Sequence, residues 1–139
     1  IIKSYKLDII QLPYNLIDRR LENKRFLKLL KKSNIEIHVR SIFLQGLLLK
    51  DSNKVPKMFY KYSKIFKKID KYCKKNLLSK LEACLNFVMS NKVINKIIIG
   101  IENKSNMVEI NNIKIRKFKF PKAESKDINL IDPRKWKKS

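Results

Sequence analysis

The apolar residues of this 139-residue chain follow two kinds of pattern. Three short runs rich in Ile, Leu and Val are typical of strands buried in a sheet, and they cover residues 7–15, 35–43 and 94–99. Elsewhere apolar positions recur at spacings of three and four, which predicts helices over 19–32, 58–72 and 79–89 and one more from residue 105. Because strands and helices alternate, we expect a parallel sheet and an α/β fold.

Polar residues mark the starts of three of these helices. Asp18 can cap the first helix by accepting a hydrogen bond from a free backbone N–H. Ser79 and Glu82 have the spacing of a capping box, in which each side chain accepts from a backbone N–H of the first turn. Ser105 can cap the last helix. Gly46 and Gly100 follow the second and third strands and predict tight turns there.

The second predicted helix is amphipathic. Lysines fill one face, and the other face carries Met58, Tyr62, Ile65, Ile69 and Tyr72. A helix lying on a membrane surface has the same pattern. Regular elements continue on both sides of this segment, so the pattern favours a helix that packs on a core.

Charge is the strongest compositional signal, with 34 Lys and Arg residues against 12 Asp and Glu residues and a net charge of +22. Such a balance is typical of a protein that binds nucleic acid or another polyanion. Lysine outnumbers arginine, however, and Ile and Asn are also abundant, so A/T-rich codons can account for the excess. We therefore favour solvated lysine faces and expect no specific nucleic-acid partner. A basic, non-catalytic module that binds a polyanion is the alternative.

Other residue types exclude several further classes. Cys73 and Cys84 lack the spacing of a zinc site or a disulfide framework, and both lie on apolar helical faces, so we expect no metal and two buried thiols. No apolar run reaches the roughly 18 residues of a membrane span. With no visible signal peptide either, the expected location is the cytoplasm. No repeat or other pattern predicts the oligomeric state.

Three strands alone would leave a small sheet with two exposed edges. As three of the eight units of a closed barrel they would be paired on both sides, so the pattern favours a (β/α)₈ TIM barrel of which this chain holds a part. The chain also begins at Ile1, within the tail of an element, which favours a fragment. From Arg116 onward it is irregular and basic, with apolar anchors at Phe118, Phe120, Ile128, Leu130 and Trp136.

Three segments resemble the aldo/keto reductase family. They read IIQLPYN (residues 9–15), EIHVRSIFLQGLL (36–48), and IIIGIE (97–102) with SNMVE (105–109) after it. The closing stretch INLIDPRKW (128–136) is similar to the end of some members. The resemblance implies that residues 1–115 hold strands 6–8 of the barrel with their helices, and that 116–139 form a basic carboxyl-terminal tail. It also implies a cofactor, NADP or NAD, at the carboxyl ends of the strands.

The resemblance implies roles for individual residues of the first two segments. Gln11 matches a buried glutamine near the nicotinamide ring, where an amide can donate and accept hydrogen bonds. Ser41 matches a serine that binds the pyrophosphate, and Phe43 and Gln45 lie in the loop that covers it. Arg40 departs from the aromatic residue of many members. Its guanidinium plane could stack on the nicotinamide or meet a cofactor phosphate or an acidic substrate.

The third segment matches the adenosine end of the cofactor site. The turn consists of Gly100, Ile101 and Glu102, and Asn106 and Glu109 lie on the helix that follows. Glu109 matches an acidic residue that contacts the adenine amino group, and backbone N–H groups at the helix start favour an anion. The lysine, serine or arginine side chains of NADP-preferring members are missing, so the choice between NADP and NAD stays open.

The resemblance implies hydride transfer from the nicotinamide to an aldehyde or ketone, with sugar-related carbonyls among the candidates. The family's Asp, Tyr, Lys and His tetrad comes from earlier strands, so we expect no catalytic residue here and no activity of the fragment alone. The only histidine, His38, lies inside the second strand and is read as a core histidine with a satisfied hydrogen bond. The expected partners are the nicotinamide cofactor and a small carbonyl substrate.

Overall fold

The computed structural model describes residues 5–136. The first four and last three residues, at the outer ends of the predicted segments 1–115 and 116–139, lie outside the described part. The strands are β1 (Ile9–Pro13), β2 (Glu36–Arg40) and β3 (Lys96–Ile97). The α-helices are α1 (Lys24–Lys32), α2 (Ser63–Lys75), α3 (Lys80–Met89), α4 (Lys104–Asn111) and α5 (Ile128–Ile131). Short 3₁₀ segments cover Arg20–Glu22, Leu47–Leu49, Lys57–Tyr62 and Pro133–Lys135.

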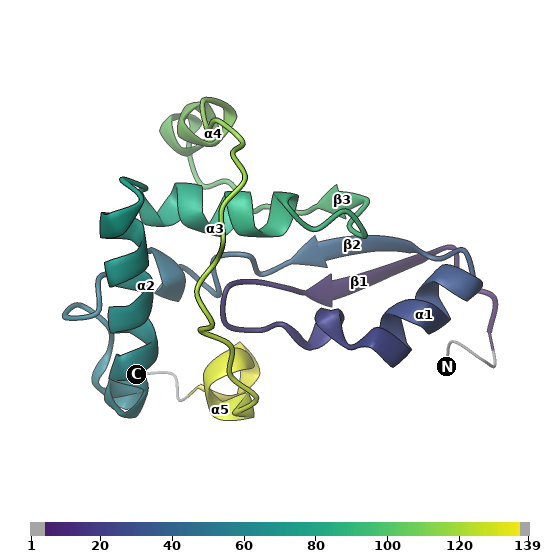
Figure 1. Ribbon diagram of the computed structural model, residues 1–139, viewed down its shortest axis with the longest axis horizontal. Coiled ribbons are helices and arrows are strands. Elements are labelled where there is room, and N and C mark those ends of the chain that lie inside the picture. The colour runs from purple at the N-terminus through teal and green to yellow at the C-terminus, as the bar shows by residue number, and fades with distance from the viewer. Residues whose placement is uncertain (1–4, 137–139) are drawn as a thin grey trace.

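The three strands form one parallel sheet in the order β1-β2-β3, which confirms the predicted parallel sheet. Gln11 of β1 lies opposite His38 of β2, and His38 lies opposite Lys96 of β3. All three strands run the same way, so their carboxyl ends meet at one edge of the sheet (Figure 1). In Figure 1, α1 runs beside β1, and α2 stands beyond the carboxyl ends of the strands.

The two faces of the sheet differ in burial. Ile37 and Val39 point to the face that forms the core and are 5% and 0% exposed. Side chains alternate along a strand, so Gln11, His38 and Lys96 share the opposite face. Gln11 and Lys96 are exposed on that face, whereas the side chain of His38 between them is only 12% exposed. Within residues 5–136 this face is therefore covered less completely than the core face.

The third strand is shorter and less buried than predicted. Residues 94–99 were expected to be covered on both faces, but β3 has two residues and Ile98 is 41% exposed. Within residues 5–136, β3 pairs only with β2, so the ladder on its other side is not formed. The missing partner explains why a run of branched residues yields so little regular strand.

Two of the three predicted helix caps were wrong. α1 begins at Lys24, where Asn23 accepts a hydrogen bond from the N–H of Phe26. Asp18 is fully buried and accepts from the backbone N–H of Arg20 at 3.3 Å, where the 3₁₀ turn before α1 begins, and from the guanidinium of Arg20 at 2.9 and 2.7 Å, but it does not cap α1. Ser105 lies inside α4, whose cap is Asn103. In each case an asparagine closer to the first regular turn has the extended backbone that a cap needs.

The third cap, the capping box of α3, is confirmed. The hydroxyl of Ser79 accepts from the N–H of Glu82 at 3.0 Å, and the carboxylate of Glu82 accepts from the N–H of Ser79 at 2.7 Å. α3 ends at Met89 as predicted, and most of its residues are buried. Cys73 and Cys84 are free, buried thiols, as expected.

The predicted apolar stripe of the second helix was partly wrong. Ile69 and Tyr72 are buried, but Met58 is 43% exposed and its neighbour Phe59 is buried instead. The segment before α2 is a 3₁₀ helix, which has three residues per turn and not 3.6. The change of period shifts the buried face by about one residue, and Phe66 joins it within α2.

The tail after α4 has no regular structure up to α5, as predicted, and it crosses the molecule between them (Figure 1). The prediction was wrong for the end of the tail, where α5 and the 3₁₀ segment Pro133–Lys135 form. Phe120 packs edge-on against Phe87 of α3, with ring centroids 5.2 Å apart. Trp136 packs edge-on against Phe59 at 4.8 Å and donates from Nε1 to the carbonyl of Leu130. These contacts bear out the predicted anchors, except that Ile128 is 51% exposed.

Candidate functional site

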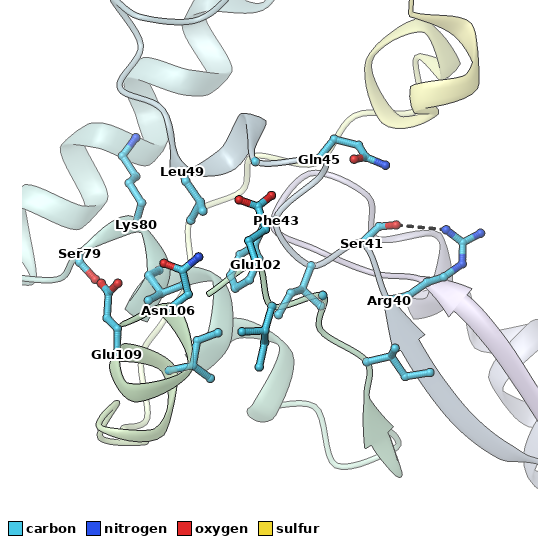
Figure 2. Close-up of a pocket in the computed structure, with 17 residues that line it drawn as sticks. Arg40, Ser41, Phe43, Gln45, Leu49, Ser79, Lys80, Glu102, Asn106 and Glu109 are labelled. Atoms are coloured by element: carbon cyan, nitrogen blue, oxygen red, sulfur yellow. Dashed lines mark hydrogen bonds between the residues drawn. The ribbon is translucent and has the colours of Figure 1, made fainter. Parts of the chain in front are cut away.

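A cleft of about 900 Å³ opens beyond the carboxyl ends of β2 and β3 (Figure 2). Its volume lies near the top of the range of roughly 300–1,000 Å³ that is usual for ligand pockets. Four segments line it: residues 40–49, 79–81, 98–102 and 106–110. The residues predicted for the site that line this cleft are Arg40, Ser41, Phe43, Gln45, Gly100, Ile101, Glu102, Asn106 and Glu109.

Gln11 is the one predicted site residue that does not line the cleft. It lies in the middle of β1 and is exposed, whereas the sequence predicted a buried amide. β1 is an edge strand, and Gln11 lies on the less covered face of the sheet in the described residues. Burial of Gln11 would therefore require elements beyond residues 5–136.

The loop after β2 forms one wall of the cleft with an unusual backbone. Ser41, Leu44 and Gln45 have φ values of 55°, 49° and 54°, and Gly46 follows with 74°. Left-handed conformations cost residues other than glycine of order 1–3 kcal/mol each, so surrounding contacts must hold them. Leu44 and Leu48 are buried and anchor the loop in the core. The predicted tight turn at Gly46 is thus confirmed, and the strain extends to its neighbours.

A buried asparagine that sequence reasoning missed holds this loop. Asn15 is fully buried, and its Nδ2 donates to the carbonyl of Ser41 at 3.0 Å. Its Oδ1 accepts from the N–H groups of Ile17 and Asp18 at 3.0 and 2.8 Å. One amide thus ties the turn after β1 to the turn after β2. The available signal was an asparagine directly after a proline-containing strand end, a usual place for a side chain that closes a turn.

Arg40 and Ser41 form the basic end of the cleft. Arg40 is the last residue of β2, and its Nη1 donates to the hydroxyl of Ser41 at 3.1 Å (Figure 2). Its guanidinium makes no ion pair with a carboxylate of residues 5–136. A guanidinium and a hydroxyl beside a strained loop can together bind an anionic group.

The opposite end of the cleft is acidic. The tight turn predicted at Gly100 does not form, because residues 98–102 run without a hydrogen-bonded turn between β3 and α4. Glu102 lies in this segment, and Glu109 lies on α4 with its side chain directed toward Ser79 (Figure 2). Both glutamates are exposed, and neither carboxylate makes an ion pair or hydrogen bond with another residue of the described chain. The N–H of Asn106 is bonded to the cap Asn103 at 2.9 Å, so this donor of the helix start is not free. Gly100 needs no left-handed backbone, and a Cβ there would meet no atom within 4 Å.

A third wall comes from the start of α3, which sequence reasoning did not place at the site. Ser79, Lys80 and Leu81 line the cleft beside α4. Lys80 directs its Nζ to the carboxylate of Asp70 on α2 and to the carbonyl of Lys50. Burial would raise the pKa of Asp70, but hydrogen bonds from Lys80 and from the N–H of Ser52 outweigh it and lower that pKa. Only tertiary packing brings α3 here.

The described cleft has no tyrosine and no histidine in its lining. His38 shares the face of the sheet that carries Gln11, but its side chain is only 12% exposed, so the predicted burial of this histidine is confirmed. Its predicted hydrogen bond was wrong, because Nε2 lies 3.3 Å from Oε1 of Glu36 without the geometry of a hydrogen bond. Burial raises the pKa of the Tyr14 hydroxyl, which donates to Glu22 at 2.8 Å, outside the cleft. The described lining of the cleft therefore offers no tyrosine or histidine that could donate a proton to a carbonyl.

Two other expectations concern the described residues as a whole. Within residues 5–136 no group of three or more His, Cys, Asp or Glu side chains could hold a metal ion. None of the helices in this range is both long and apolar enough to cross a membrane. Lys80 is the only lysine of the described chain in the cleft lining, and binding of a polyanion stays the alternative prediction.

Comparison with known proteins identified one family. The model of the Aldo/keto reductase family matches residues 2–133, nearly the whole chain. No curated protein matches the sequence.

Proposed function

The chain belongs to the aldo/keto reductase family, and we propose that its cleft binds the nicotinamide dinucleotide, NADP or NAD, that the family uses. The family carries out NAD(P)-dependent oxidoreduction on a (β/α)₈ barrel, and the chain has a three-stranded parallel sheet of that α/β class. One observation carries the proposal. Residues 40–45 and 100–109, selected by resemblance and far apart in the sequence, line one cleft at the carboxyl ends of parallel strands.

The sheet supports the further proposal that β1, β2 and β3 are strands 6–8 of the barrel. Two strand edges are unpaired within residues 5–136, and unpaired edges are a liability that a closed barrel removes. The face that carries Gln11 and His38 would then point into the barrel. In that setting Gln11 would be buried, and its amide could bind the carboxamide of the nicotinamide. Residues 116–139 would form the carboxyl-terminal tail.

The residues of the cleft fit a dinucleotide in charge and shape. Arg40 and the hydroxyl of Ser41 would bind the pyrophosphate, and Asn15 fixes the backbone of Ser41 for this contact. Phe43 and Gln45 would cover it from the loop, while the segment from Gly100 to Glu102 and α4, with Asn106 and Glu109, would contact the adenosine. When bound, the cofactor supplies the hydride that reduces an aldehyde or ketone, sugar-related carbonyls included.

The described chain would bind and orient the cofactor but would not donate a proton to the substrate. No tyrosine or histidine of residues 5–136 lines the cleft, so the general acid must come from elsewhere in the barrel. We therefore expect the 139-residue chain to bind cofactor without oxidising NADH or NADPH in the presence of aldehydes and ketones. A carbonyl-dependent loss of the NADH or NADPH absorbance, faster than in a protein-free control, would contradict the expectation that this chain binds the cofactor without catalysing its oxidation.

Cofactor binding can be tested by titrating the full chain with NADH and NADPH and following their fluorescence. A Gly100→Leu variant would place a bulky side chain in the cleft, where a Cβ meets no protein atom, and should weaken binding at least tenfold without loss of stability. Ser33→Leu adds the same bulk at the exposed end of α1, beside the amino end of β2, and should change nothing. Equal weakening by both variants would remove the cleft as the site.

A further inference from the structure

The outer side of α2 exposes only cations. Every exposed residue of this helix is a lysine, and the set comprises Lys64, Lys67, Lys68, Lys71, Lys74 and Lys75. Four of them recur at spacings of four and three residues between Lys64 and Lys75, so they lie in one row along the helix. At about 1.5 Å of rise per residue, the row is about 16 Å long. The opposite side of α2 is buried in the core.

The tail adds a second set of cations beside this row. Within residues 116–122 the exposed side chains are again all basic: Arg116, Lys117, Lys119 and Lys122. Phe120 lies between them and packs on Tyr72 of α2, with ring centroids 5.8 Å apart. The Nζ of Lys68 donates to the carbonyl of Lys122, which ties the tail to the row. The exposed cations of α2 and of residues 116–122 therefore form one surface, the basic face.

No carboxylate neutralises the basic face within residues 5–136. Asp70, the only acidic residue of α2, pairs with Lys80 of α3. Glu124, the first acidic residue after this part of the tail, lies 3.9 Å from Arg19. None of the cations of the basic face forms an ion pair in the described chain. An excess of lysine over the whole chain does not by itself keep acids away from one surface.

We propose that the basic face binds the sugar–phosphate backbone of double-stranded nucleic acid without reading its sequence. A duplex carries one charge per about 1.7 Å of its axis, so the row on α2 spans about ten phosphates. Each phosphate that a lysine neutralises releases condensed counterions, and a duplex releases more of them per contact than a single strand does. None of the cations lines the cofactor cleft, so this inference is independent of the proposed function.

The composition of the basic face explains why sequence would not be read. Its exposed side chains include no Asn, Gln or aromatic residue that could contact a base edge or stack on a base. The aromatic side chains that alternate with its cations, Phe118 and Phe120, pack against the core instead. What remains exposed is a set of flexible cations, which suits phosphates and not bases.

An anionic membrane is the other surface that a row of lysines could meet. Helices that bind membranes also insert apolar side chains, and neither α2 nor residues 116–122 expose any. The observations therefore favour nucleic acid. Leu77, which follows α2, is 91% exposed and could serve as an apolar anchor, so the test includes anionic vesicles.

The test follows the fluorescence anisotropy of a labelled DNA duplex, two helical turns long and of arbitrary sequence, as the full chain is added at several salt concentrations. Near physiological salt we expect a dissociation constant of about 1–100 μM, the usual range for non-specific binding. The logarithm of the affinity should fall linearly with the logarithm of the salt concentration. A second duplex of unrelated sequence should bind equally well.

A variant of the basic face carries Lys64→Gln, Lys71→Gln, Lys75→Gln and Lys119→Gln. All four lysines are exposed, and none donates a side-chain hydrogen bond within the described chain, so the fold should be kept; circular dichroism checks this. Lys68 is retained because it holds the tail. Loss of four phosphate contacts should reduce the salt slope by about 3–4 and weaken duplex binding at least about tenfold.

The matched control removes the same charge from α1, which lies far from α2 in Figure 1. It carries Lys24→Gln, Lys28→Gln, Lys31→Gln and Lys32→Gln, all at exposed positions. Because these lysines lie outside the basic face, the control should weaken duplex binding less than about threefold and change the salt slope by less than about one.

The outcomes decide between the basic face, net charge and a membrane. Equal weakening by the two variants would show that net charge alone attracts DNA, and it would overturn the inference. Absence of duplex binding near physiological salt would overturn it as well. Tighter binding to vesicles of phosphatidylcholine and phosphatidylserine than to the duplex would make a membrane the partner instead. Salt-dependent duplex binding that the basic-face variant loses and the α1 variant keeps would establish the inference.

Discussion

Replacing Asn15 by alanine should destabilise the protein strongly, because this one side chain joins the turns that follow β1 and β2. Asn15 is fully buried and makes three side-chain hydrogen bonds, at 3.0, 3.0 and 2.8 Å. Alanine would leave the N–H groups of Ile17 and Asp18 without these acceptors in a site closed to water. The carbonyl of Ser41 would keep its bond from the N–H of Leu44 at 3.0 Å.

The magnitude follows from the two orphaned donors. A buried polar group that loses its partner costs roughly 1–3 kcal/mol, so the two donors together should lower the free energy of unfolding of Asn15→Ala by about 2–6 kcal/mol. Because folded domains are stable by only about 5–15 kcal/mol, such a loss is easy to measure. Urea unfolding followed by circular dichroism would show it as a lower midpoint with an unchanged slope.

Two matched variants make this test specific. Asn23→Ala removes an amide that makes one exposed cap bond to the N–H of Phe26, and it should cost about 1 kcal/mol. Asn15→Asp keeps the acceptor for Ile17 and Asp18 but loses the donor to Ser41, and it places a negative charge in a buried site. An Asn15→Ala protein no less stable than Asn23→Ala would refute the view that this asparagine holds the loop.

Three further predictions concern other parts of the fold. Gly46→Ala should lower the free energy of unfolding by about 1–2 kcal/mol, because Gly46 has a φ of 74°. Gly100→Ala should leave the unfolding midpoint unchanged, because its backbone is not left-handed and a Cβ there meets no atom within 4 Å. Equal losses of stability in the two variants would contradict this. Tyr72→Phe should keep or raise the thermal midpoint, because the buried hydroxyl of Tyr72 has no hydrogen-bond partner, and burial raises its pKa to about 12. A clear drop in the midpoint would show that the hydroxyl does have a partner. Burial also raises the pKa of the Cys73 and Cys84 thiols, so iodoacetamide should label both only after the protein unfolds. Stoichiometric labelling of the native protein would contradict the packing of α2 against α3.

The elements that sequence reasoning predicted well are those with local causes. The parallel order of the strands follows from alternation of apolar runs and helical periods along the chain. The capping box at Ser79 and Glu82 needs only two residues three apart. Gly46 adopts the left-handed backbone that its place after a strand predicted. For the capping box and for Gly46, the information lies within a few neighbouring residues, and for the strands it lies in the order of short segments along the chain.

The errors arose where distant segments decide the outcome. Asp18 was available as a cap, but the fold buries it against Arg20, so Asn23 caps α1. Gln11 was expected to be buried, but its burial depends on what covers its face of β1, and Gln11 is exposed within the described residues. The same dependence on neighbouring segments explains the short β3, which pairs only with β2.

Patterns along the chain predicted the α/β class of the fold, and the family resemblance identified residues of segments 40–45 and 100–109 as candidates for a site. The packed fold was needed to show that these segments share a cleft with the start of α3, that Lys80 pairs with Asp70, and that Asn15 holds the loop at Ser41. Periodicity and capping depend on neighbours along the chain, whereas cleft shape, ion pairing and burial depend on residues that only packing brings together.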